Sequence, residues 1–133
     1  MRNLLPRFAG FLLAVTIVDP AGARSALQRD VEDYAVASCL ASQDQAYLKD
    51  QGDGWASVIV QRAKGGLEPL KAVAAAVKAE LAKGNMPVIR SETEPGKGKA
   101  LPVLYCSEIV DAPGVRAAID GAMKKLAAAY RSR

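Results

Sequence analysis

The sequence predicts an all-α fold, a compact bundle of about four to five helices closed by one disulfide. Alanine is abundant and only 5% of the residues are aromatic, so the core must come from aliphatic side chains and from helices that approach closely. Apolar residues recur at helical spacing in several segments. The chain has two cysteines, Cys39 and Cys106, which form a single candidate pair.

The N-terminus has the features of a cleaved secretion signal. Two arginines precede an uncharged, mostly apolar run over residues 8–18, and Ala21-Gly22-Ala23 supplies the small residues that precede a signal-peptidase site. A retained membrane anchor is disfavoured because a spanning helix needs about 20 residues. We therefore expect a signal peptide over residues 1–23, a single helical domain over 24–133, and a periplasmic location.

Export determines the expected state of the cysteines. In an oxidising compartment a distant cysteine pair forms a disulfide, and two free thiols are the disfavoured alternative. The sequence contains no Cys-x-x-Cys motif, which argues against a thiol oxidoreductase. The net charge of +4 is small and dispersed. We expect an ordinary solvated surface, no nucleic-acid partner, and no membrane contact after signal cleavage; an acidic protein partner or the anionic envelope is also compatible.

The first helix is predicted over residues 30–50, with Cys39 in its middle on or near the buried face. Carboxylates favour the positive end of a helix dipole. Three of them are placed in its first turn: Asp30, Glu32 and Asp33. Gly52 is expected to end this helix.

A second helix is predicted from Gly54, capped by Asp53, to the pair Gly65-Gly66. The run at residues 58–60 (VIV) leaves a strand as the alternative. Trp55, the only tryptophan, is expected to lie in the core rather than at an interface.

The third helix, from Pro69 to Lys83, shows the clearest pattern. Proline suits the first helical turn, where its missing N–H is not needed. Five apolar residues form one stripe: Leu70, Val73, Ala74, Val77 and Leu81.

Residues 85–101 interrupt the helical pattern. The segment 91–99 is polar and rich in glycine and proline, and connections of this length are usually functional or disordered. A short extended piece is expected at Met86–Ile89.

The chain returns to helices after this loop. A fourth helix is predicted over 101–110, with a strand as the alternative. Asp111 is expected to cap a last helix that has Pro113 in its first turn. Its apolar stripe is Val115, Ile119, Ala122, Met123, Leu126 and Tyr130.

Most catalytic chemistries are disfavoured by composition. The chain has no histidine, which removes Ser-His and Cys-His nucleophiles and the usual zinc and haem sites. Phosphate-loop and dinucleotide motifs are also absent. Carboxylate-only catalysis remains open, with Asp30, Glu32, Asp33, Glu80, Glu92, Glu94 and Glu108 as candidates. We favour solvated charges for these residues, and therefore expect no enzyme, no cofactor and no metal.

Several segments together resemble one family. These are DYAVASCL at residues 33–40, Trp55 at the start of the next segment, GLEPL at 66–70 before a helix that ends AELA, and YCSEI at 105–109. Over roughly residues 31–120 the chain resembles the immunity proteins that protect bacteria against type VI secretion amidases.

The resemblance implies a disulfide-bridged, all-α periplasmic protein that often forms a homodimer. Its partner would be a peptidoglycan amidase effector of the papain-like type, whose active-site cleft it occludes partly with a protruding loop. We assign six residues to that partner-binding loop: Ser91, Glu92, Thr93, Glu94, Lys97 and Lys99. The alternatives are a small periplasmic acid-stress chaperone or another envelope-binding protein.

Overall fold

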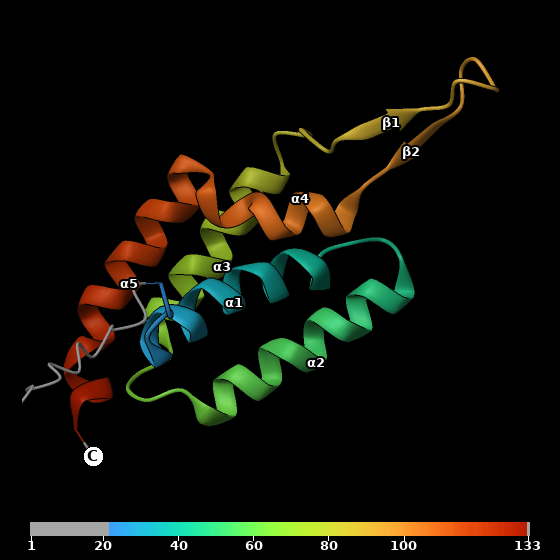
Figure 1. The fold of residues 1–133 in the computed structure, drawn as a ribbon. Helices are drawn as coiled ribbons and strands as arrows, with labels where there is room; N and C mark the ends of the chain where they lie inside the picture. The colour runs from blue at the N-terminus through green and yellow to red at the C-terminus, as the bar shows by residue number, and fades with distance from the viewer. Residues whose placement is uncertain (1–21, 133) are drawn as a thin grey trace, which may run out of the picture.

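The computed structural model describes residues 22–132, which form five α-helices, one 3-10 helix and a two-stranded hairpin (Figure 1). The elements are α1 (Ala26–Ala41), α2 (Ala46–Arg62), α3 (Glu68–Leu81), β1 (Val88–Arg90), β2 (Gly98–Ala100), α4 (Pro102–Glu108), η1 (Ile109–Asp111) and α5 (Pro113–Arg131). The predicted all-α fold with one disulfide is confirmed. Apart from its last two residues, the predicted signal peptide lies outside the described residues.

Helix α1 is the centre of the bundle. It packs against α2 on one side and against α3, α4 and α5 on the others, while α3 and α5 also pack against each other. The core is aliphatic, as the composition predicts. It comprises Val31, Ala35, Cys39, Leu70, Val73, Val77, Cys106, Ile109, Val115, Ile119, Ala122 and Leu126. Within residues 22–132, no helix combines the length and the apolar character that a bilayer crossing requires.

The first helix differs from the prediction at both ends. It begins at Ala26 because Ser25 caps it: the Ser25 hydroxyl accepts a hydrogen bond from the Gln28 N–H at 3.1 Å. The three carboxylates over residues 30–33 therefore lie beyond the first turn. The helix ends at Ala41, and residues 42–45 form a turn before α2, so the continuous helix over 30–50 is wrong.

Gly52 lies inside α2 and does not end a helix. Because glycine has no Cβ, α1 and α2 can approach closely at this position. A Cβ placed there would lie 2.2 Å from the backbone N of Ala41 and 2.7 Å from the carbonyl O of Ala37. Asp53 is likewise within α2 and caps nothing. The prediction that Gly52 ends a helix is wrong, because the close packing of α1 against α2 is what requires a glycine here.

The later elements follow the predicted order. The VIV run is helical, α2 ends at Arg62 before the glycine pair, and α3 has its proline in the first turn. Residues 102–108 are helical, which excludes the strand alternative. Asp111 does not cap α5; Ala112 occupies the N-cap position without a side-chain hydrogen bond. The extended piece is β1, at Val88–Arg90, and β2 was not predicted.

Candidate partner-binding hairpin

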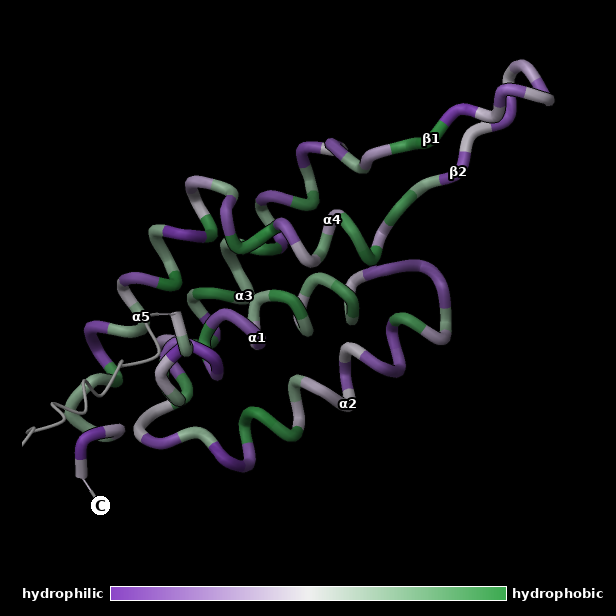
Figure 2. Tube along the Cα trace, viewed as in Figure 1, coloured by the Kyte–Doolittle hydropathy of each residue, from purple (hydrophilic) through white to green (hydrophobic). Residues whose placement is uncertain are grey.

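The β1–β2 hairpin projects away from the helices (Figure 1). The two strands are antiparallel and pair Val88 with Ala100, Ile89 with Lys99, and Arg90 with Gly98. Gly98 leaves space for a neighbouring side chain, because a Cβ there would lie 2.6 Å from Cγ1 of Val88. Residues 91–97 connect the strands and form the hairpin tip, which is hydrophilic (Figure 2).

The hairpin tip is held by its own hydrogen bonds. The Ser91 hydroxyl accepts from the N–H of Glu94 at 3.1 Å, and the Lys97 N–H donates to the Glu94 carbonyl at 3.1 Å. The side chains of Lys97 and Glu94 also form an ion pair. Gly96 has a φ of +93°, a conformation that favours glycine. The connection is therefore a structured turn.

The structure brings the six predicted partner-binding residues together on this hairpin. Five lie in the tip and Lys99 lies in β2, and all six are exposed to solvent. Within the described chain Arg90 and Lys99 have no carboxylate within 4.0 Å, whereas Lys97 is paired. The hairpin thus presents two unpaired cations next to its polar tip.

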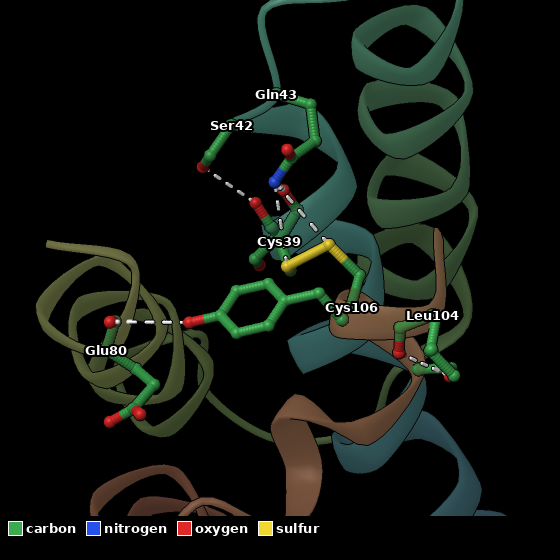
Figure 3. The surroundings of a disulfide bond; sticks show 9 residues. Cys39, Ser42, Gln43, Glu80, Leu104 and Cys106 are labelled. Carbon is green, nitrogen blue, oxygen red and sulfur yellow. Dashed lines mark hydrogen bonds between the residues drawn. A yellow bond between two sulfur atoms is a disulfide. The ribbon is translucent and has the colours of Figure 1, made fainter. Parts of the chain in front are cut away.

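The disulfide anchors the C-terminal end of the hairpin. Cys106 lies in α4, which begins two residues after β2, and it bonds Cys39 in α1 with a Cα–Cα distance of 5.4 Å. Both cysteines are fully buried. The Gln43 side-chain amide donates to the Cys39 carbonyl at 3.0 Å and lies 3.6 Å from the Cys106 sulfur (Figure 3). Helix α4, which follows the hairpin, is therefore tied to α1 at Cys106, in its second turn.

A second contact joins the two helices that flank the hairpin. The Tyr105 hydroxyl in α4 donates to the backbone carbonyl of Glu80 in the last turns of α3, at 3.4 Å. Burial, assisted by the nearby charge of Glu80, raises the pKa of Tyr105, so this hydroxyl stays protonated and able to donate. This bond thus joins the helix before the hairpin, α3, to the helix after it, α4.

Two of the carboxylates considered for catalysis are buried in ion pairs. Asp30 accepts from Arg62 at 2.8 Å and from the Tyr130 hydroxyl at 2.8 Å. These contacts join α1 to α2 and to the end of α5. Asp30 therefore stabilises the packing of α1 through these contacts. The prediction that it lies in the first turn of the helix is wrong, because that turn has no acidic residue.

Glu32 has the same role two residues further along α1. It accepts from Arg116 at 2.9 Å, from Gln28 at 3.1 Å and from Arg24 at 3.3 Å. Burial acts to raise the pKa of Glu32, but the hydrogen bonds from these three side chains outweigh it and lower the pKa below its ordinary value. Glu32 therefore stays ionised as the hub of a network. Sequence reasoning missed this role because Arg116 is distant in the chain.

Trp55 is not in the core. It is 37% exposed and lies on the outer face of α2 with Tyr47 and Val58. The reason is that α2 packs against α1 alone, so it buries only the narrow side that carries Gly52 and Ile59. The prediction of a core tryptophan is wrong, and the outer face of α2 is partly apolar.

Of the remaining candidate carboxylates, Asp33 shares Arg24 with Glu32 through an ion pair at 2.9 Å, and the others lie apart from both buried carboxylates. Glu80 pairs with Lys83 at 2.7 Å, Glu94 pairs within the tip, and Glu108 is exposed on α4. Across residues 22–132, no three acidic or cysteine side chains are grouped so as to hold a metal ion. Comparison of the chain with protein families, curated proteins and solved structures found no match. The projecting hairpin is therefore the feature that the geometry singles out.

Proposed function

We propose that this chain is a periplasmic immunity protein that binds a type VI secretion peptidoglycan amidase and occludes its active-site cleft with the hairpin. The observation that carries the proposal is the hairpin itself, which projects from the bundle and collects all six assigned residues. The target class comes from the resemblance of the DYAVASCL and YCSEI segments to that family. In this proposal the chain is an inhibitor and not an enzyme.

The mechanics of the hairpin suit inhibition of a cleft. Its tip is ordered by internal hydrogen bonds, and its helical end is fixed by the Cys39–Cys106 bond. A loop that is ordered before binding loses less conformational entropy on docking. The charges of the tip then contribute more to partner selection than to raw affinity. The disulfide also fits the proposed periplasmic location, where thiols are oxidised.

Co-purification tests the proposal directly. The chain, purified from the periplasm, is mixed with the peptidoglycan amidase encoded by the neighbouring gene, and binding and cell-wall hydrolysis are measured. We expect a stable complex and loss of hydrolysis. Glu92→Arg in the tip should weaken binding at least about tenfold, equivalent to about 1.4 kcal/mol.

Asp120→Arg is the matched control, because Asp120 is an exposed acid on α5 with no ion pair to any described residue. It should bind and inhibit like the wild type. If the wild-type chain forms no complex and leaves hydrolysis unchanged, the proposed function is wrong.

The resemblance adds a homodimer to the proposal. We assign its interface to the outer face of α2, where Tyr47, Trp55 and Val58 expose apolar surface that a second copy can cover. Sedimentation of the wild type should give twice the mass of one chain, and Val58→Asp should give a monomer. A wild-type monomer at high concentration contradicts this part of the proposal only.

An acid-stress chaperone is the second candidate, and the buried carboxylate Glu32 favours it. Protonation of Glu32 at strongly acid pH removes its ion pair with Arg116, which joins α1 to α5. A chaperone of this class should bind a hydrophobic dye and suppress client aggregation near pH 2–3. A chain that stays folded there and protects no client excludes it.

A further inference from the structure

The disulfide is the attachment point of a long exposed segment. Between Val77 in α3 and Cys106 in α4 no residue is buried, because every position from 78 to 105 is exposed or only partly buried. Cys106 is therefore the first residue after α3 whose side chain lies fully within the core. We call residues 85–108 the arm; they comprise the connection after α3, the hairpin and α4.

The elements of the arm are too small to be stable alone. Helix α4 has seven residues, its N-cap residue Leu101 makes no side-chain hydrogen bond, and Cys106 is its only buried residue. Isolated helices shorter than about 12 residues are marginal in water, and so is a single two-stranded hairpin. The strands β1 and β2 contact mainly each other, and α4 packs mainly against α1. The arm therefore needs its anchor on α1 to keep its structure.

The contact of α4 with α1 is centred on Cys106. Its sulfur is bonded to Cys39, and the Gln43 side-chain amide lies 3.6 Å from it (Figure 3). Among the described residues, the remaining hydrogen bond from an α4 side chain to another helix runs from the Tyr105 hydroxyl to the Glu80 carbonyl, at 3.4 Å. That bond joins α4 to the end of α3 where the arm begins, and does not reach α1. The covalent bond is thus what fixes α4 to the centre of the bundle.

The rest of the bundle is held by contacts outside the arm. Helices α1, α3 and α5 pack through aliphatic residues of their own, and the core resumes after the arm at Ile109. The ion pair of Asp30 with Arg62 joins α1 to α2, and that of Glu32 with Arg116 joins α1 to α5. These contacts do not involve either cysteine. Separation of the two sulfurs should therefore open the arm locally and leave the bundle folded.

We propose that the Cys39–Cys106 pair is a redox switch for the arm. With the disulfide formed, α4 and the hairpin are docked on α1; with two thiols, the arm is released from a bundle that stays folded. The bond forms by thiol–disulfide exchange: the two thiols lose two protons and two electrons to the disulfide of an oxidoreductase, which becomes a dithiol. A dithiol reductant reverses the exchange, and is itself converted to a disulfide.

The switch determines when the hairpin can bind. This effect on binding rests on the proposed function, in which the hairpin is the partner-binding element. Where only a fraction of the reduced molecules has the arm docked, the apparent affinity falls by that fraction. Thiols stay reduced in the cytoplasm and are oxidised after export. A chain that has not been exported is therefore a weak inhibitor, and oxidation in the periplasm makes it a strong one.

Hydrogen exchange measured by mass spectrometry on the purified chain tests the switch. The oxidised wild type is compared with the double variant Cys39→Ala, Cys106→Ala and with wild type produced and kept in dithiothreitol. In both samples that lack the bond, amides of α4 should exchange at least about tenfold faster than in the oxidised chain, while α3 and α5 stay protected. Unchanged protection of α4, or an equal loss of protection in all helices, would overturn the switch.

Val73→Ala is the matched control. Val73 is fully buried in α3, so its truncation destabilises the bundle while the disulfide stays intact. This variant should accelerate exchange in α3 at least as much as in α4. Selective exposure of α4 in Val73→Ala would mean that α4 opens first in any destabilised bundle, and would overturn the specific role of the bond.

Binding to the amidase of the neighbouring gene separates the switch from the proposed function. The double cysteine variant should bind at least about tenfold more weakly than the oxidised wild type, and Val73→Ala within about twofold of it. If the wild type and the double variant bind equally, the switch does not control binding and is wrong, while the proposed function stands. If the wild type does not bind, the proposed function fails, and the exchange of α4 still decides whether the bond controls the arm.

Discussion

The close contact of α1 with α2 gives the sharpest prediction, since two glycines of α2 differ only in what surrounds them. A Cβ at Gly52 would lie 2.2 Å from the backbone N of Ala41 and 2.8 Å from its Cα, whereas a Cβ at Gly54 meets nothing within 4 Å. The atoms around Gly52 are backbone and cannot rotate away. Gly52→Ala must therefore move one helix relative to the other, and Gly54→Ala moves nothing.

The magnitudes follow from two opposing terms. Alanine is favoured over glycine inside a helix by about 1 kcal/mol, and both variants gain this amount. Gly54→Ala should therefore stabilise the protein by about 1 kcal/mol. Overpacking costs about 1–3 kcal/mol. Because the clash at Gly52 is with backbone atoms, the overpacking cost of Gly52→Ala should be about 3 kcal/mol. Its net loss is then about 2 kcal/mol, and the two variants should differ by about 3 kcal/mol.

Urea denaturation followed by circular dichroism, with the disulfide intact, measures both variants. The midpoint should fall for Gly52→Ala and rise for Gly54→Ala, with the same slope m as the wild type. Equal free energies of unfolding for the two variants would refute the reasoning, because the separation of α1 and α2 would then not depend on the missing side chain at Gly52.

Three further predictions concern the bonds that close the bundle. Loss of the Cys39–Cys106 bond, which spans a sequence separation of 67, should cost about 4 kcal/mol of unfolding free energy by the chain-entropy argument. Folding lowers the pKa of Glu32, so the stability it contributes is present above its unfolded pKa and is lost as pH falls through the folded pKa. In urea denaturation at a series of pH values, the free energy of unfolding of Glu32→Gln should fall less steeply toward acid pH than that of the wild type. An equal dependence on pH in the two proteins contradicts this. Tyr130→Phe should cost about 2 kcal/mol by removing a hydrogen bond to a buried carboxylate, whereas the exposed Tyr47→Phe should cost nothing measurable in the same assay.

Helices α3 and α5 were predictable because their signals are local. Each has a proline in the first turn and an apolar stripe at helical spacing, and the buried members of both stripes are those expected from the sequence. The stripe residues Leu81, Met123 and Tyr130 are partly buried and pack against the same core. A helix that buries one side has apolar residues at helical spacing along that side, and this pattern can be seen in its own sequence.

The hairpin was predictable only in part. The polar composition of residues 91–99 predicts an exposed loop, and the structure places the assigned residues there. The second strand was missed because three residues, one of them Gly98, carry no periodic pattern. The exposure of Val103 and Leu104 was missed as well, since these residues suit a core as well as a surface. The structure shows both exposed on α4.

The helical class, the cysteine pair, the aliphatic core and the polar connection before α4 all follow from residue periodicity, composition or count. None of these depends on which segments are neighbours in space. The close contact at Gly52, the exposure of Trp55 and the buried ion pairs of Glu32 depend instead on how the helices pack. The physical reason is that the free energy of a glycine, an aromatic ring or a carboxylate depends on which segments approach it, and those segments are distant in the chain.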